Sequence, residues 1–304
     1  MAENQRRPKR RKLELYRLTI SGLVDGTDYQ KFLKSIWSNL DDRETRVFEN
    51  GDKGHALDTL REVQGDLWFQ FFSYSAGERP DVLDVDDMSI SDNPLTPSEA
   101  LLHWTHALGE QRDDRYVMLV ERVQTGIWPS KLEHYLDWLI GHAKNEAIVK
   151  KHTADAKEPI SVALELEADA SFLKLVNSME RIVSASVRIN RPNPGWGDYE
   201  DLLSEEAKSS DAQSAEVTMK ARRGASLAKG DGIVKAMKEA YKENQLGRAS
   251  VEGDIDGERK TISTLSHGKS QYKYLAVNPN GTVDHSAARD SFFEVLGKMD
   301  DDVS

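Results

Sequence analysis

Basic side chains are concentrated between residues 181 and 248, where they could bind phosphates. Two expected strands end in basic residues, and a glycine-containing loop and a lysine-bearing helix follow the second strand. The candidate phosphate ligands are Arg188, Arg191, Lys220, Arg222, Arg223, Lys229, Lys235, Lys238 and Lys242. From residue 220 to residue 248 there are eight basic and three acidic side chains, whereas the whole chain carries a net charge of -11. A locally positive surface on an acidic protein is typical of a polyanion site.

The loop and helix after the second of these strands offer two kinds of phosphate contact. Gly230, Asp231 and Gly232 precede an apolar-periodic run and predict a turn followed by a helix capped by Asp231. The first turn of such a helix presents backbone N–H groups to a phosphate, and its three lysines share one stripe because they are spaced i, i+3 and i+7. A plain helix start and a solvated lysine face would give the same pattern. Trp196, in the Pro/Gly loop between the strands, could stack on a base or cover the core.

Asp254, Glu258 and Lys260 form the one pattern with catalytic potential. Two carboxylates that hold Mg²⁺ beside a lysine that assists the attacking water are typical of metal-dependent nucleases. Here the two carboxylates flank a tight, solvated turn, so a nuclease is the alternative function. The sequence has no GxxxxGK[ST], GxGxxG or GxSxG motif and no cysteine, which excludes disulfides, thiolate zinc sites and cysteine nucleophiles. We therefore expect no catalytic residue, no metal and no cofactor.

Two further groups have the residue types of metal ligands. His103 and His106 are three residues apart in a helix expected over 97–109, with Thr96 as its cap, and could share a face. The segment 77–94 is rich in aspartate but lacks the spacing of a calcium loop. We expect ordinary histidines and a solvated acidic edge strand and loop.

The N-terminus carries charge without an apolar segment behind it. Its basic residues are Arg6, Arg7, Lys9, Arg10, Arg11 and Lys12. They form either a solvated leader or an arm that touches phosphates. No apolar run reaches the roughly 18–20 residues of a membrane helix. The absence of a signal peptide and of cysteine favours a cytoplasmic protein.

The pattern of elements predicts a mixed α+β fold with mainly antiparallel sheets, flanking helices and two subdomains. We expect a basic arm at 1–12, an N-terminal α+β domain at 13–149, a linker at 150–159 and a C-terminal α+β domain with the basic face at 160–304. Strands are expected at 13–20, 45–50, 66–74, 115–123, 160–167, 181–189, 214–222 and 272–277. Helices are expected at 29–40, 97–109, 128–145, 171–179, 199–208, 232–241 and 286–299, and a hairpin turns at Asp256-Gly257.

The segment ISVALELEADASFLKLVNSMERIVSASVRINRPNP, an acidic helix and the strand AEVTMKARRG carry a resemblance in element order. Over roughly residues 115–235 the chain resembles the family of phage exclusion proteins that includes RexA of phage lambda and the DNA-binding components of anti-phage systems such as Kiwa. In that family a β-α-β unit ends in a basic, proline-containing strand exit, and a second strand ends in another basic exit. The chain departs from the family in its basic leader, its negative net charge and its glycine-rich 224–232 loop.

The resemblance implies a non-enzymatic homodimer that binds double-stranded DNA without strong sequence preference, beside a membrane-protein partner, in anti-phage defence. Arg188, Arg191, Arg222 and Arg223 would inherit the phosphate contacts. A third possibility is a protein-interaction subunit whose basic face meets an acidic partner.

Overall fold

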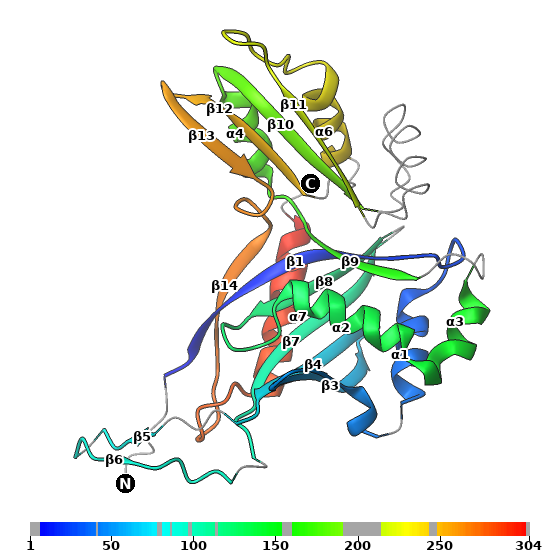
Figure 1. Cartoon of the computed structure of the whole chain (residues 1–304), viewed down its shortest axis with the longest axis vertical. Helices are drawn as coiled ribbons and strands as arrows, with labels where there is room; N and C mark the ends of the chain where they lie inside the picture. The colour runs from blue at the N-terminus through cyan, green and yellow to red at the C-terminus, as the bar shows by residue number, and fades with distance from the viewer. Residues whose placement is uncertain are drawn as a thin grey trace. The chain divides into compact units, whose positions relative to one another are not determined.

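The computed structural model describes residues 7–40, 42–77, 81–85, 87–96, 99–112, 115–153, 160–190, 214–242 and 248–301. The chain divides into two compact units, and both contain segments that are distant in sequence. Unit 1 comprises Met1–Leu13, Gly22–Val162 and Tyr272–Ser304, and unit 2 comprises Glu14–Ser21 and Ala163–Gln271. Antiparallel sheets with flanking helices confirm the α+β class (Figure 1).

Unit 1 is built on an antiparallel meander in the order β8-β7-β4-β3-β2. Its strands are β2 (Val47–Asn50), β3 (Lys53–Val63), β4 (Asp66–Ser75), β7 (His103–Arg112) and β8 (Arg115–Arg122). Beyond β8 the sheet order continues with β1 (Lys9–Ser21) and β14 (Ser270–Leu275). A short hairpin, β5 (Val82–Leu83) and β6 (Ile90–Ser91), forms a separate two-stranded sheet.

Three of the helices of unit 1 begin within one residue of their expected starts, whereas the sequence indicated no helix at 146–152. The helices are α1 (Tyr29–Ser38), α2 (Pro129–Gly141), α3 (Glu146–His152) and α7 (His285–Asp301), with 3-10 turns at Glu44–Arg46 and Ala143–Asn145. Asp28 caps α1 by accepting a hydrogen bond from the backbone N–H of Lys31 at 3.0 Å, as its position before the apolar run predicts. Phe292, Val295 and Leu296 are buried on α7, which contacts β7, so the structure groups this helix with unit 1 rather than with the second domain.

Four features of unit 1 differ from the expectations. The helix expected at 97–109 is wrong, because that segment leads into β7. Thr105 to Gly109 are buried in succession, since β7 is a central strand covered on both faces, and the period of two is therefore hidden. The sequence also missed β3, whose alternation is broken by a register shift between Leu57 and Thr59. The β1 strand begins at Lys9, so the basic residues at 9–12 lie in a strand and not in a leader. The linker expected at 150–159 begins inside α3, which ends at His152.

Unit 2 contains a second antiparallel sheet in the order β11-β10-β12-β13. Its elements are β9 (Ser161–Leu166), which pairs with β1, α4 (Ala170–Ser178), β10 (Arg181–Asn190), β11 (Ser214–Lys220), α6 (Gly232–Lys242), β12 (Ala249–Ile255) and β13 (Glu258–Ser263). One face of the sheet packs on α4 and α6 through a core that includes Phe172, Ile182, Met237 and Val251. The hairpin turn at Asp256-Gly257 is confirmed, since both residues have positive φ (53° and 75°). Arg191, Trp196 and the helix expected at 199–208 lie outside the described residues.

Gly253 lets the β12 strand lie against the start of β10. A Cβ at this position would collide with the carbonyl oxygen of Arg181 and lie 2.6 Å from the Sδ of Met179. Because the carbonyl belongs to the paired strand, it cannot move aside. We expect Gly253→Ala to lower the free energy of unfolding by about 1–3 kcal/mol in a urea titration. Gly230→Ala is the matched control, since nothing lies within 4 Å of its added Cβ; an equal loss in both variants would contradict the collision.

Candidate nucleic-acid interface

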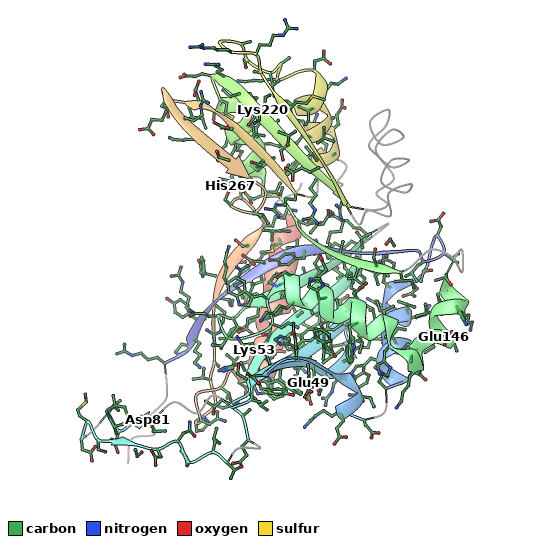
Figure 2. The ribbon with its side chains drawn as sticks, in the orientation of Figure 1. Glu49, Lys53, Asp81, Glu146, Lys220 and His267 are labelled. Carbon is green, nitrogen blue, oxygen red and sulfur yellow. The ribbon has the colours of Figure 1, made fainter. Side chains whose placement is uncertain are left out.

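The pairing register of β10 and β11 decides where the strand-end cations lie. Arg188 is opposite Glu216, whereas Lys220 is opposite Ser184 at the start of β10. Four residues of strand separate these two positions, or roughly 13 Å. The C-terminal ends of two neighbouring antiparallel strands lie at opposite ends of the sheet. Arg188 near the end of β10 and Lys220 at the end of β11 therefore do not form one cluster. In the view of Figure 2, Lys220 lies higher in unit 2 than His267, which follows the β13 strand on the Arg188 side.

The loop of residues 221–231, here the cationic loop, is hydrogen-bonded to the first residues of β10. Ala221 N–H donates to the carbonyl of Val183 at 2.8 Å, and Leu227 N–H donates to that of Ile182 at 2.8 Å. The hydroxyl of Ser226 accepts from Ile182 N–H at 3.0 Å, and the Nε of Arg181 donates to the carbonyl of Ala225 at 2.8 Å. These bonds hold a loop without regular structure in one conformation before any ligand binds.

Three exposed cations lie at the start of this loop: Lys220 is the last residue of β11, and Arg222 and Arg223 are in the loop itself. Within the described ranges, none of them forms a salt bridge with a carboxylate. Gly224 follows them with a φ of 83°, a left-handed conformation that turns the chain and suits glycine. The loop and the end of β11 therefore present three adjacent positive charges that no carboxylate of the described ranges neutralises.

The lysines of the expected helix stripe are partly used by the fold. The Nζ of Lys229 donates to the carbonyl of Asn177 at 2.8 Å, and the Nζ of Lys238 donates to the carbonyl of Lys229 at 3.0 Å. Burial, reinforced by the charges of Lys229 and Lys242, lowers the pKa of Lys238. Lys235 lies 3.7 Å from Glu239, four residues along α6. Lys242 is exposed in the last turn, far along the helix from the loop.

The face of the sheet opposite α4 and α6 is lined by short hydroxyl side chains and balanced charges. By alternation from the buried positions, it carries Ser184, Ser186, Arg188, Glu216, Thr218, Lys220, Ser250, Glu252, Asp254, Arg259, Thr261 and Ser263. Arg259 donates to Asp254 at 2.6 Å and to Glu252 at 3.2 Å, and Ser186 donates to Glu216 at 2.6 Å. The three cations of this set are offset by three carboxylates, whereas residues 221–231 carry three cations and one carboxylate, so the local charge favours the cationic loop over the sheet face as a contact surface.

The structure does not bring the candidate nuclease residues together. Asp254 is opposite Arg259, whereas Glu258 is opposite Ile255 and Lys260 is opposite Gly253. Because side chains alternate between the faces of a sheet, Glu258 and Lys260 point away from the face that carries Asp254. Glu258 instead lies 3.4 Å from Lys260. No group of three metal-ligating side chains occurs in the part of the chain that the structure describes.

Unit 1 contains a buried hydrogen-bond chain that the sequence did not reveal. The carboxylate of Glu121 lies 2.6 Å from the Nδ1 of His106, and it accepts a hydrogen bond from the Nε of Arg11 at 2.8 Å. The Nε2 of His106 lies 2.8 Å from the Nδ1 of His285 on α7. Trp68 stacks on His106 with 5.4 Å between the ring centroids. His103 lies on the same strand three residues away, so the two histidines are on opposite faces and do not share the face that a helix would give them.

Consecutive hydrogen bonds join the side chains of Glu121, His106 and His285. A carboxylate only accepts hydrogen bonds, so the Nδ1 of His106 is the donor to Glu121. Burial, followed by the neighbouring His106, lowers the pKa of His285. Arg11 and Glu121 are 110 residues apart in sequence, and His106 and His285 are 179 residues apart. No local spacing could therefore have indicated these contacts.

Comparison with known proteins adds one finding. Residues 142–282 match a family described as a domain of unknown function (DUF4747). The match covers less than half of the chain and includes the candidate interface. No curated protein matches the sequence. The family's description gives no activity, so it does not link the chain to the phage exclusion proteins.

Proposed function

We propose that this protein is a non-enzymatic DNA-binding protein that contacts the phosphates of double-stranded DNA through Lys220, Arg222 and Arg223. The observation that carries the proposal is the cationic loop: three exposed positive charges that pair with no carboxylate among the described residues, on a backbone fixed by hydrogen bonds to β10. Phosphates accept hydrogen bonds from such side chains whatever the base sequence, so this contact gives affinity without specificity.

The register divides the remaining candidates into supporting and separate contacts. Lys229, Lys235 and Lys238 belong to the loop and the adjacent part of α6, so they raise the local potential even where they bond to carbonyls. Arg188 and Lys242 lie nearer the opposite end of the sheet, beside Arg248, whose carbonyl accepts from Arg188 N–H at 2.8 Å. A DNA duplex lying along the sheet would be needed to engage both ends.

The role in anti-phage defence beside a membrane-protein partner rests on the resemblance alone, and the cytoplasmic location rests on the sequence composition. No helix in the described part of the chain is both long and apolar enough to cross a bilayer. An acidic protein would engage the same three cations as DNA does, and that is the second candidate function. The charge and exposure of the loop favour both, whereas its fixed backbone and the absence of an exposed large apolar side chain from residues 221–231 favour phosphate.

The salt dependence of binding tests the proposal. Three phosphate contacts predict a slope of about −2.7 for log K against log salt, and hence an affinity about forty-fold lower at 200 mM than at 50 mM salt. Fluorescence anisotropy with two duplexes of unrelated sequence would measure this, and both should bind alike. Absence of binding at 50 mM salt would refute the proposal. Nicking of a supercoiled plasmid with Mg²⁺, if lost in Glu258→Ala but kept in Glu252→Ala, would instead establish the nuclease.

A further inference from the structure

An arm in unit 1 exposes apolar side chains that nothing in the described chain covers. The arm, residues 81–85 and 87–92, contains the β5–β6 hairpin. Its exposed apolar residues are Val82, Leu83, Val85, Met88 and Ile90, with exposed fractions from 43% to 77%. Exposed apolar patches of this kind on a folded protein mark interaction sites.

The arm is too small to be stable alone. Each of its strands has two residues, and the hairpin is closed by a hydrogen bond from Asp84 N–H to the carbonyl of Ser89 at 2.8 Å. Isolated two-stranded hairpins are marginally stable in water, even when they are longer than this. A surface that buries the apolar side chains would supply the missing stabilisation.

The charge of the arm restricts what that surface can be. The described residues of the arm include four aspartates and no lysine or arginine: Asp81, Asp84, Asp87 and Asp92. All four are exposed. A surface that covers both the apolar and the acidic side chains must therefore combine exposed aromatic or aliphatic groups with positive charge.

Unit 1 itself carries a surface of this composition, here the tyrosine edge: Lys9, Arg10, Tyr272 and Tyr274. Tyr272 and Tyr274 alternate on β14 and are 55% and 65% exposed. The guanidinium of Arg10 lies 3.9 Å from the centroid of the Tyr272 ring, and Lys9 is exposed beside it. β14 is the last strand in the order of its sheet, and such an edge strand has backbone N–H and C=O groups free to pair with an added strand.

We propose that the arm of one copy docks on the tyrosine edge of a second copy, and that the protein forms a two-fold dimer by this reciprocal exchange. In one copy the described residues of both surfaces are exposed, so these residues do not cover one another within the chain. Each copy supplies one acidic apolar arm and one basic aromatic edge. Two copies therefore make two identical contacts and leave neither surface open, which is how closed dimers form. The proposal does not depend on DNA binding.

Charge exchange between the two surfaces tests the proposal. The parent protein should show about twice the mass of the 34.2 kDa chain in light scattering coupled to gel filtration. Asp84→Lys with Asp87→Lys (the arm variant) and Lys9→Glu with Arg10→Glu (the edge variant) should each be monomeric. Mixed in equal amounts, the two variants should form a heterodimer, because each arm then meets an edge of opposite charge.

The controls separate this contact from other causes. Asp25→Lys with Asp42→Lys changes the net charge of unit 1 by the same amount as the arm variant, at exposed positions outside the arm, and should remain dimeric. A parent protein that is monomeric at all concentrations would overturn the proposal, as would dimers that survive in both variants. Variants that become monomeric but do not pair on mixing would show that the arm and the edge each contact something else, and this outcome also overturns it.

Discussion

Glu121→Ala is expected to lower the free energy of unfolding by about 3–5 kcal/mol, the range for removal of one partner from a buried ion pair. The side chain of Glu121 is fully buried, as is that of His106. The carboxylate accepts hydrogen bonds from Arg11 and from the backbone N–H of His106, and it lies 2.6 Å from the Nδ1 of the same histidine. Alanine removes the acceptor that these donors share, and the donors of His106 are fully buried.

Urea unfolding followed by tryptophan fluorescence would measure this loss, because Trp68 stacks on His106 and reports on the site. Glu62→Ala is the matched control. Glu62 also forms an ion pair, at 2.6 Å from Lys34, but its side chain is about half exposed. Exposed pairs contribute roughly 0–1 kcal/mol, so the control should lose little. Similar losses in the two variants would mean that the buried chain contributes no more than a surface pair.

Combined reversal of Lys220, Arg222 and Arg223 to glutamate is expected to abolish DNA binding. Three phosphate contacts contribute a factor on the order of a thousand to the affinity at 50 mM salt. All three side chains are exposed, so the circular dichroism spectrum should not change. Anisotropy titrations at several salt concentrations would show both the loss of affinity and a flatter salt slope in any residual binding.

The control for this variant must change the net charge equally. Lys31, Lys34 and Lys150 are exposed on the helices of unit 1, and their combined reversal alters the charge by the same amount. We expect this variant to keep most of its affinity. An equal loss in both would show that total charge, rather than the cationic loop, governs binding. Full affinity in both would place the site elsewhere, and the basic residues at the start of β1 would be the next to test.

The sequence predicted those parts of the fold that local chemistry determines. The Asp28 cap, the Asp256-Gly257 turn and the final helix depend on neighbouring residues, and the structure confirms all three. The segment that becomes β7 was misassigned because burial on both faces removes the alternation that identifies a strand.

The candidate site was predicted only in part, because register and distant pairing are not local. Residue types indicated the cations of the loop, but only the pairing of Arg188 with Glu216 shows that the β10 and β11 exits lie at opposite ends. In the same way, the alternation of side chains on β13 separates Glu258 from Asp254. The Glu121–His106–His285 chain joins three segments of sequence that share no motif.

The division of unit 1 between both ends of the chain has a consequence for synthesis on the ribosome. His285 and the α7 helix belong to unit 1, yet they are translated after all of unit 2. Unit 1 therefore cannot complete its core during elongation, and its nascent sheet must wait while more than a hundred intervening residues emerge. Until then the face that receives Phe292 stays open. Unit 2 consists of residues 14–21 and the continuous segment 163–271, all of which are translated before α7. Unit 2 can therefore complete its core before unit 1, although most of unit 1 is synthesised first.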